Sequence, residues 1–87
     1  MIIIYKSLIE NYVKNKLTIT DIKNFALKNN ISITELESII IYNYIKINYK
    51  LIISNKNFDF SELKEKIRPE LYNEIIKLYM KYKSKLF

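Results

Sequence analysis

The 87-residue chain contains no cysteine, no histidine and no glycine, and these absences exclude most familiar kinds of functional site. Without cysteine there is neither a disulfide nor a thiolate ligand for a metal. Without histidine, the commonest general base and the commonest metal ligand are missing together. Without glycine, no phosphate-binding loop of the Walker or Rossmann kind is expected. We therefore expect a protein that is not an enzyme and that binds no metal and no cofactor.

The sequence also lacks an apolar run long enough to cross a membrane. Its most apolar region, residues 36–53, is interrupted by Glu37, Lys46 and Lys50. A membrane-spanning helix needs about 20 largely uncharged residues. The first residues do not show the basic segment that precedes the apolar run of a secretory signal. These features predict a soluble cytoplasmic protein.

What the chain does have is a large apolar fraction and a surplus of positive charge. Apolar residues make up 49% of the sequence, which suffices for one modest core in a single domain, residues 1–87. The net charge of +6 favours a nucleic acid or an anionic surface as partner. However, Ile, Lys, Asn and Tyr all have A/T-rich codons, so the base composition of the coding region is an alternative explanation for the many lysines.

Three segments carry the same pattern for the start of a helix. An apolar residue is followed by a capping oxygen, a carboxylate three positions later and a second apolar residue. The oxygen and carboxylate pairs are Thr18 and Asp21, Ser32 and Glu35, and Asp59 and Glu62. In such a capping box each side chain accepts a hydrogen bond from the backbone N–H of the other residue. The repetition predicts several short helices with defined starts.

The apolar spacing predicts an all-α fold, a compact bundle of four to five short helices. The expected helices cover residues 2–16, 18–29, 32–53, 59–66 and a last helix that begins at Pro69. The longest and most apolar of them, about 32–53, is expected to be the central helix. Residues 45–51 also alternate between apolar and polar like a strand, but no partner strand is evident, so we favour a helix.

Two features of these helices are predicted from single residues. Asn29 and Asn30 are expected to end the second helix, because asparagine adopts the left-handed conformation more readily than most non-glycine residues. In the long helix, Asn43, Lys46 and Lys50 are expected to form one narrow polar stripe.

Residues 21–39 fit the register of a helix-turn-helix motif. Ala26 would be the small residue of the first helix, and Asn30 would occupy the turn. The apolar positions that lock the second helix would be Ile31, Leu36 and Ile39. That second helix, however, would present Glu35 and Glu37 to DNA in place of the Arg, Lys, Asn or Gln that reads bases. The motif is therefore a degenerate helix-turn-helix that lacks the side chains needed to recognise bases.

The C-terminal segment is rich in lysine. Positive charges without any acidic side chain occupy residues 77–87, at Lys77, Lys81, Lys83 and Lys85. With the neighbouring tyrosines they could bind nucleic acid through phosphate contacts and stacking. Lysines near the end of a helix also stabilise its dipole, and a charged face can simply be the solvated side of an amphipathic helix. Nucleic-acid binding is thus the alternative prediction for function.

The chain contains eight tyrosines and four phenylalanines, more than a small core can hold. Exposed tyrosines beside apolar neighbours are typical of protein interfaces. The residues that we expect to contact a partner are Tyr42, Tyr44, Tyr49, Tyr72 and Tyr79. The main prediction is a non-enzymatic helical binding or regulatory module that acts through protein–protein contacts or self-association, with a homodimer as one form.

Segments 17–26, 31–34 and 67–71 resemble a family of short uncharacterised helical proteins from spore-forming Gram-positive bacteria. The matching positions are helix caps and apolar core positions, and the resemblance covers most of the chain from Leu17 onward. It implies a small cytoplasmic all-helical protein. It assigns no activity, and no functional residue is carried over from it.

Overall fold

A computed structural model of the chain describes residues 2–55 and 57–86, with side chains for 6–55, 57–81 and 83. The described part of the chain contains helices and no strand. The helices are α1 (Ile2–Asn15), α2 (Ile19–Lys28), α3 (Glu35–Ser54), α4 (Ser61–Lys64) and α5 (Pro69–Leu86). The predicted all-α fold with a long central helix is confirmed, and residues 45–51 are helical.

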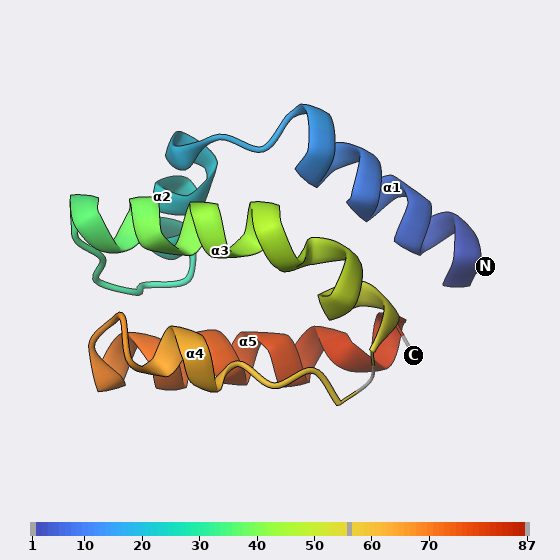
Figure 1. Cartoon of the computed structure of the whole chain (residues 1–87). Coiled ribbons are helices and arrows are strands. Elements are labelled where there is room, and N and C mark those ends of the chain that lie inside the picture. Colours follow the sequence, from blue (N-terminus) through green and yellow to red (C-terminus); the bar gives the residue numbers. More distant parts are fainter. Residues whose placement is uncertain (1, 56, 87) are drawn as a thin grey trace.

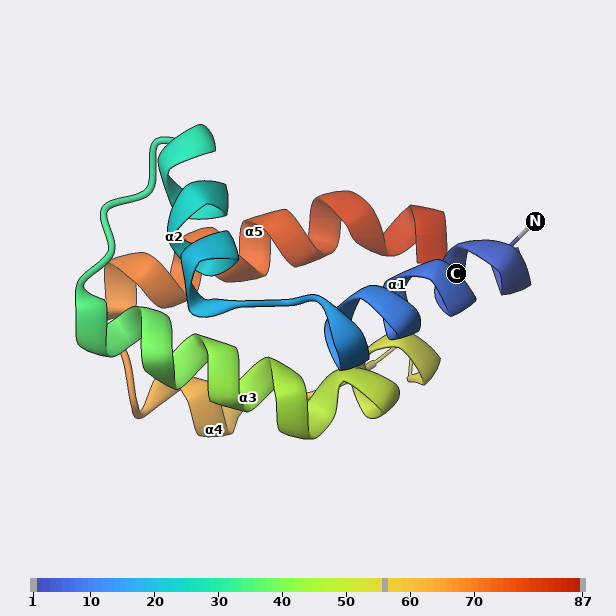
Figure 2. The ribbon, with the colours of Figure 1, turned by 90° about the horizontal axis from the view of Figure 1, so that it is seen from above.

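The helices pack around α3, which extends along most of the molecule. In Figures 1 and 2, α3 and α5 run in the same direction and α1 runs the opposite way. The short helix α2 lies across α3 near its start, and α4 lies on the return path from α3 to α5. α3 contacts both α1 and α2, and α5 contacts α1 and α4. Seen from above, α3 forms one edge of the bundle, so one of its sides has no helix over it (Figure 2).

The start of α2 follows the predicted capping box. The Asp21 backbone N–H donates to Thr18 Oγ1 at 3.1 Å, and the Thr18 N–H donates to Asp21 Oδ2 at 2.9 Å. Both donors would otherwise be unpaired at the helix end. Hydrogen bonding with the Tyr12 side chain, and next with the Thr18 backbone, lowers the pKa of Asp21. The cap therefore also joins α2 to the last turns of α1.

The start of α3 is two residues later than predicted, and Ser32 is not its cap. Thr34 is the N-cap, with Thr34 Oγ1 accepting from the Glu37 N–H and Glu37 Oε1 accepting from the Thr34 N–H, each at 3.1 Å. The Ser32 carbonyl accepts a hydrogen bond from the Arg68 guanidinium at 2.8 Å. Glu35 occupies the first helical position and pairs with Lys23 of α2. The predicted Ser32–Glu35 box is therefore wrong.

The predicted Asp59–Glu62 capping box is also wrong. Asp59 instead accepts hydrogen bonds from the backbone N–H and the hydroxyl of Ser61, at 2.9 and 3.0 Å. α4 is a single turn, shorter than the expected 59–66. Glu62 lies near Lys66, with 3.5 Å between oxygen and nitrogen. Asp59 thus shapes the approach to α4 without forming the reciprocal pair.

The end of α2 is closed by the asparagine pair, as predicted. Asn30 adopts a left-handed conformation with φ of 57°. The Ile31 N–H donates to the Ala26 carbonyl at 2.8 Å, and the Asn30 N–H donates to the Leu27 carbonyl at 3.1 Å. These two bonds make a Schellman motif, which usually has glycine at the left-handed position. Asparagine fills that position in a chain without glycine.

The core lies where α3 meets α4, α5 and the segment before α4. Its buried side chains are Ile41, Tyr44, Phe60, Leu63, Ile67 and Leu71. Phe60 packs edge-on against Phe58 and Tyr79, with 4.8 Å between ring centres in both pairs. Edge-to-face packing of this kind adds about 0.5–1.5 kcal/mol to the burial of each aromatic pair. Part of the aromatic content is therefore used inside the fold.

Candidate functional site

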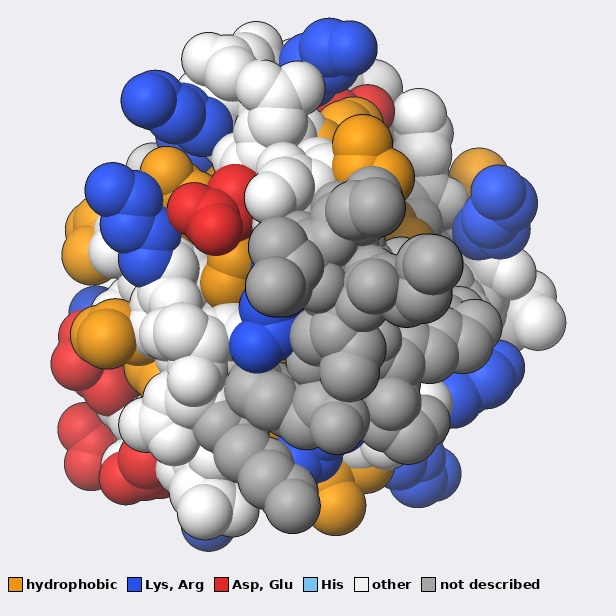
Figure 3. All heavy atoms as spheres, turned by 90° about the vertical axis from the view of Figure 1, so that its right-hand side faces the viewer, with side chains coloured by type: hydrophobic (Ala, Val, Ile, Leu, Met, Phe, Trp, Pro, Cys, Tyr) orange, Lys and Arg blue, Asp and Glu red, His pale blue; other side chains and the backbone are white. Residues whose placement is uncertain are grey.

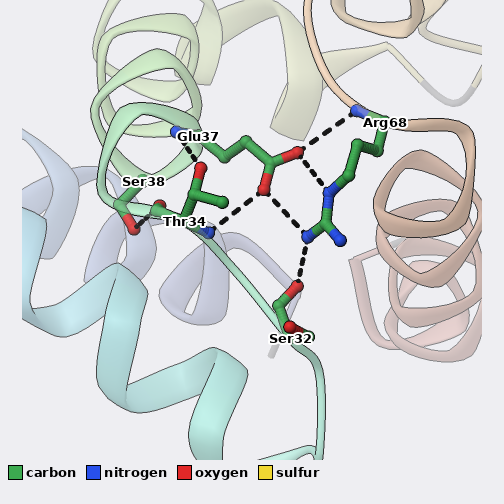
Figure 4. Close-up of polar contacts among 5 residues, drawn as sticks. All are labelled: Ser32, Thr34, Glu37, Ser38 and Arg68. Atoms are coloured by element: carbon green, nitrogen blue, oxygen red, sulfur yellow. Dashed lines mark hydrogen bonds and ion pairs between the residues drawn. The ribbon is translucent and has the colours of Figure 1, made fainter.

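The most strongly paired polar group in the fold is the carboxylate of Glu37. Figure 4 shows it between the start of α3 and Arg68, just before α5. Glu37 Oε2 accepts from Arg68 Nε at 2.9 Å and from the Arg68 backbone N–H at 3.2 Å. Glu37 Oε1 accepts from the other guanidinium nitrogen at 2.9 Å as well as from Thr34. One carboxylate thus joins segments that lie 31 residues apart.

This cluster stabilises the fold, and the Glu37 carboxylate is poorly placed to act as a catalytic group or a ligand. Glu37 is only 6% exposed. Hydrogen bonding to the Arg68 side chain is the main cause that lowers the pKa of Glu37 to about 2, against the opposing effect of burial. Both carboxylate oxygens already accept two hydrogen bonds. Among the described residues, no three carboxylate, histidine or cysteine side chains lie together in a way that could hold a metal ion.

Lys46, one of the three residues of the predicted polar stripe on α3, is half-buried and contacts α1. Its ammonium donates to the carbonyl oxygens of Val13 at 2.9 Å and Lys14 at 3.1 Å. These carbonyls belong to the last turn of α1, which has no helical N–H to bond them. A positive charge at the C-terminal end of a helix also interacts favourably with the helix dipole. Lys46 therefore fastens the end of α1 to the middle of α3.

The tyrosines predicted to contact a partner do not share one exposed surface. Tyr44 is 6% exposed and belongs to the core, so its ring is not available to a partner in the folded chain. Tyr72 and Tyr79 are half-buried on α5 and pack against that core. Tyr42 and Tyr49 are half-buried on α3, and the Lys46 ammonium lies 5.9 Å from the centre of the Tyr42 ring. Packing within the bundle thus accounts for much of the aromatic surface.

The lysines predicted for nucleic-acid binding have local contacts. Lys77 lies 3.5 Å from Glu74, and the Lys83 ammonium lies 6.0 Å from the centre of the Tyr79 ring. Lys81 also takes part in an interaction, and the side chain of Lys85 lies outside the described residues. On the face drawn in Figure 3, the described Lys and Arg side chains are spread over several separate places.

The segment with helix-turn-helix spacing forms two helices, but they are not locked as that motif requires. Ala26 is buried and Asn30 is left-handed, as the register predicts. Leu36, however, is 66% exposed and locks nothing, which corrects that prediction. Glu35 reaches back to Lys23 of α2. The first turn of α3 therefore carries carboxylates where a DNA reader needs donors.

The most unusual surface of the molecule is the outer face of α3, which we define by Leu36, Ile40, Asn43, Ile47 and Leu51. Ile47 is 79% exposed and Leu51 is 57% exposed. Ile40 is half-buried and packs against the core, and Asn43 is exposed. These residues follow one another at steps of three or four, so they lie along one side of the helix. The exposure of Leu36, Ile47 and Leu51 agrees with the ribbon in Figure 2, where one side of α3 has no helix over it.

Sequence reasoning identified α3 as a helix with little polar surface but not which side would face outward. The signal that finds the outer face is the position of Asn43, a single polar residue between apolar residues at helical spacing. The docking of Lys46 on α1 then fixes the rotation of α3 in the bundle. Isolated apolar residues on a surface are ordinary, whereas a continuous apolar stripe marks a contact surface.

No known family model, no curated protein and no solved structure matches this chain. The resemblance to helical proteins of spore-forming bacteria therefore stays a prediction. In the described part of the chain, no helix has the length and apolar character needed to cross a bilayer.

Proposed function

We propose that this protein is a small helical binding module that self-associates through the outer face of α3. The observation that carries the proposal is the exposure of Leu36, Ile47 and Leu51 along one side of the longest helix. Covering this side would remove apolar surface from water at about 25 cal/mol for each Å². The 20 residues of α3 span about 30 Å, which offers a long contact to a second helix.

The order of residues on this face favours a second copy of the chain as the partner. Read from either end, the face begins with leucine, continues with isoleucine and reaches Asn43 near its middle. In an antiparallel pair of α3 helices, Leu36 would meet Leu51 of the other copy, and Ile40 would meet Ile47. A two-fold symmetric interface needs this kind of self-complementary surface.

Asn43 would lie next to the two-fold axis. Its amide can both donate and accept a hydrogen bond, so two copies can satisfy each other. A single asparagine in an apolar helical contact is a known means of fixing the register of two helices.

Sedimentation across a concentration series tests the association. We expect the wild-type protein to shift from monomer to dimer in the micromolar range and Ile47→Lys to remain a monomer. Met80→Lys is the matched control, because Met80 is 58% exposed on α5, away from the outer face. The proposal is wrong if the wild-type protein is a strict monomer at high-micromolar concentration or if both variants behave alike.

The absence of cysteine allows a direct test of the antiparallel register. Leu36→Cys and Leu51→Cys are prepared separately, mixed and oxidised. An antiparallel dimer predicts a disulfide that links one copy of each variant and little linkage within each variant alone. Linkage of Leu36→Cys to itself would indicate a parallel pair. If no mixture forms a disulfide, the outer face does not pair with a second copy. Binding of a different protein to the outer face would then favour a heteromeric module.

Nucleic-acid binding has less support than self-association. The first turn of α3 carries Glu35 and Glu37, and Lys77 lies next to a carboxylate. A nucleic-acid surface needs positive charge gathered along the path of the phosphates. We therefore keep this function as the alternative that a salt-dependence experiment decides.

A further inference from the structure

A cavity of about 370 Å³ lies inside the bundle and is lined by residues of all five helices. None of the residues that define the outer face of α3 is part of this lining. Its walls are almost wholly apolar, with side chains such as Ile22, Ala26, Ile45, Ile75 and Leu78. Small-molecule sites in proteins are mostly apolar and have volumes of roughly 300–1,000 Å³. The cavity therefore has the size and the lining of a ligand site.

The lining of the cavity extends along the two longest helices. On α3 it reaches from Ile41 to Ile52, and on α5 from Leu71 to Tyr79. At 1.5 Å per residue these stretches are about 16 and 12 Å long. The two helices run in the same direction (Figure 1). An apolar cavity of about 150 Å³ in another protein binds one benzene, so this larger and longer cavity is better filled by an extended alkyl chain than by a single ring.

The mouth of the cavity carries negative charge. Tyr12 and Phe25 line the cavity and are 42% and 47% exposed, so the cavity reaches the surface beside them. Asp21, which is hydrogen-bonded to the Tyr12 side chain, is the one charged residue among the described residues of the lining. That hydrogen bond, and next the one from the Thr18 backbone, lowers the pKa of Asp21. Asp21 is therefore a carboxylate at neutral pH.

We infer that the cavity binds the alkyl chain of a small amphiphile whose polar end is a hydrogen-bond donor without negative charge, such as a fatty alcohol. The chain lies between α2, α3 and α5, and the hydroxyl at the mouth donates to Asp21. The Asp21 carboxylate accepts from the Thr18 N–H at 2.9 Å and from Tyr12, and a carboxylate has acceptor sites for about four hydrogen bonds. A fatty acid offers no donor at neutral pH, and its charge is repelled by Asp21.

Titrations with 1-octanol, 1-hexanol and octanoate test the inference at pH 7 and physiological salt, followed through the backbone amide signals by NMR. We expect saturable binding of 1-octanol, with the largest shifts around the cavity residues Ala26 and Ile45. Two further buried methylenes should make 1-octanol bind about fifteen-fold more tightly than 1-hexanol. Absence of saturable binding, or shifts confined to Ile47 and its neighbours on the outer face, would overturn the inference.

A larger side chain in the cavity wall separates binding inside the bundle from binding at its surface. Ile75→Phe occupies part of the cavity and should weaken 1-octanol binding at least ten-fold, with circular dichroism to verify that the variant is folded. Leu78→Phe is the second variant, for use if the first does not fold. Ile47→Lys is the control and should bind 1-octanol like the wild type, which also separates this inference from the proposed dimer. Unchanged binding by a folded Phe variant would show that the cavity is not the site.

Asp21→Asn tests the role of the mouth. Asparagine keeps a side-chain oxygen for the Thr18 N–H but removes the negative charge. The wild-type protein should prefer 1-octanol to octanoate, and we expect Asp21→Asn to reduce that preference at least three-fold, because octanoate is no longer repelled. Tighter binding of octanoate than of 1-octanol by the wild type, or an unchanged preference in the variant, would contradict the selectivity assigned to Asp21.

Discussion

At the scale of single residues, the fold depends on Arg68, the only arginine in a chain with fourteen lysines. Its planar guanidinium bonds both oxygens of Glu37 and the Ser32 carbonyl at once. A lysine ammonium is a single point of charge and cannot reproduce this fork. The rarity of arginine here is a signal that sequence reasoning missed.

Arg68→Lys is therefore expected to lower the free energy of unfolding by about 1–2 kcal/mol, since it loses charge-assisted hydrogen bonds while keeping the charge. Urea denaturation followed by circular dichroism measures the change. Lys66→Ala is the matched control, because Lys66 pairs with Glu62 at the surface. Exposed pairs contribute little, so the control should change stability by less than about 0.5 kcal/mol. Equal effects of the two substitutions would contradict this assignment.

The Glu37 carboxylate also predicts how stability depends on pH. Its pKa is lowered from 4.5 to about 2 in the folded chain. The folded state thus binds this proton less readily than the unfolded state, and the stabilisation is complete above pH 4.5. It is lost as the pH falls from 4.5 toward 2, by up to about 3 kcal/mol in all. Denaturation midpoints across this range measure the effect, and Glu37→Gln should make the dependence clearly shallower.

At the scale of the helices, Lys46 is expected to determine the stability of the end of α1. Lys46→Met keeps the apolar stem but removes the donor to the Val13 and Lys14 carbonyls. We expect faster amide exchange in the last turn of α1 and a loss of about 1 kcal/mol, as for other helix-end interactions. Lys50→Met, on the same helix but exposed, is the control. Unchanged amide exchange in α1 would show that the contact of Lys46 with α1 does not stabilise the end of that helix.

Asn30 sets the direction of the chain between α2 and α3. Its φ of 57° is costly for residues with a Cβ, although less so for asparagine. We expect Asn30→Ala to lower stability by about 1 kcal/mol and Asn30→Gly to leave it unchanged or slightly raised. Thermal unfolding of the two variants gives the comparison. A glycine variant less stable than the alanine variant would show that the asparagine side chain itself is essential.

The helices themselves could be predicted from the sequence, but the choice between neighbouring caps could not. The sequence offers a capping box at Ser32 and another at Thr34, and local rules do not separate them. The contact of Glu37 with Arg68, 31 residues away, is formed only when Thr34 is the cap. At Thr18 no distant contact competes, and there the prediction is confirmed. Local signals therefore suffice only where long-range contacts agree with them.

At the scale of the whole molecule, periodicity reveals which residues share a helix face but not which face meets solvent. For α3 the sequence predicted a polar stripe but not its orientation, and in the bundle Ile47 lies at the surface while Lys46 contacts α1. The cavity that Tyr79 lines is likewise a product of five helices packing together. Neither surface can be derived from one segment alone. Both features therefore depend on the assembled fold.

The net charge of +6 yields the last prediction, which concerns the whole surface. Because the described Lys and Arg side chains are spread over several places on the face drawn in Figure 3, we expect weak, salt-sensitive retention on heparin without a dominant site. Replacing Lys77, Lys81, Lys83 and Lys85 with glutamine should lower the eluting salt concentration no more than replacing four lysines elsewhere. The matched set is Lys14, Lys16, Lys28 and Lys64, which are exposed on other parts of the chain. A much larger fall in the eluting salt concentration for the C-terminal set would instead identify that segment as the nucleic-acid surface. Lysines spread evenly over a surface would contribute equally, so only a local concentration of charge could produce such a difference.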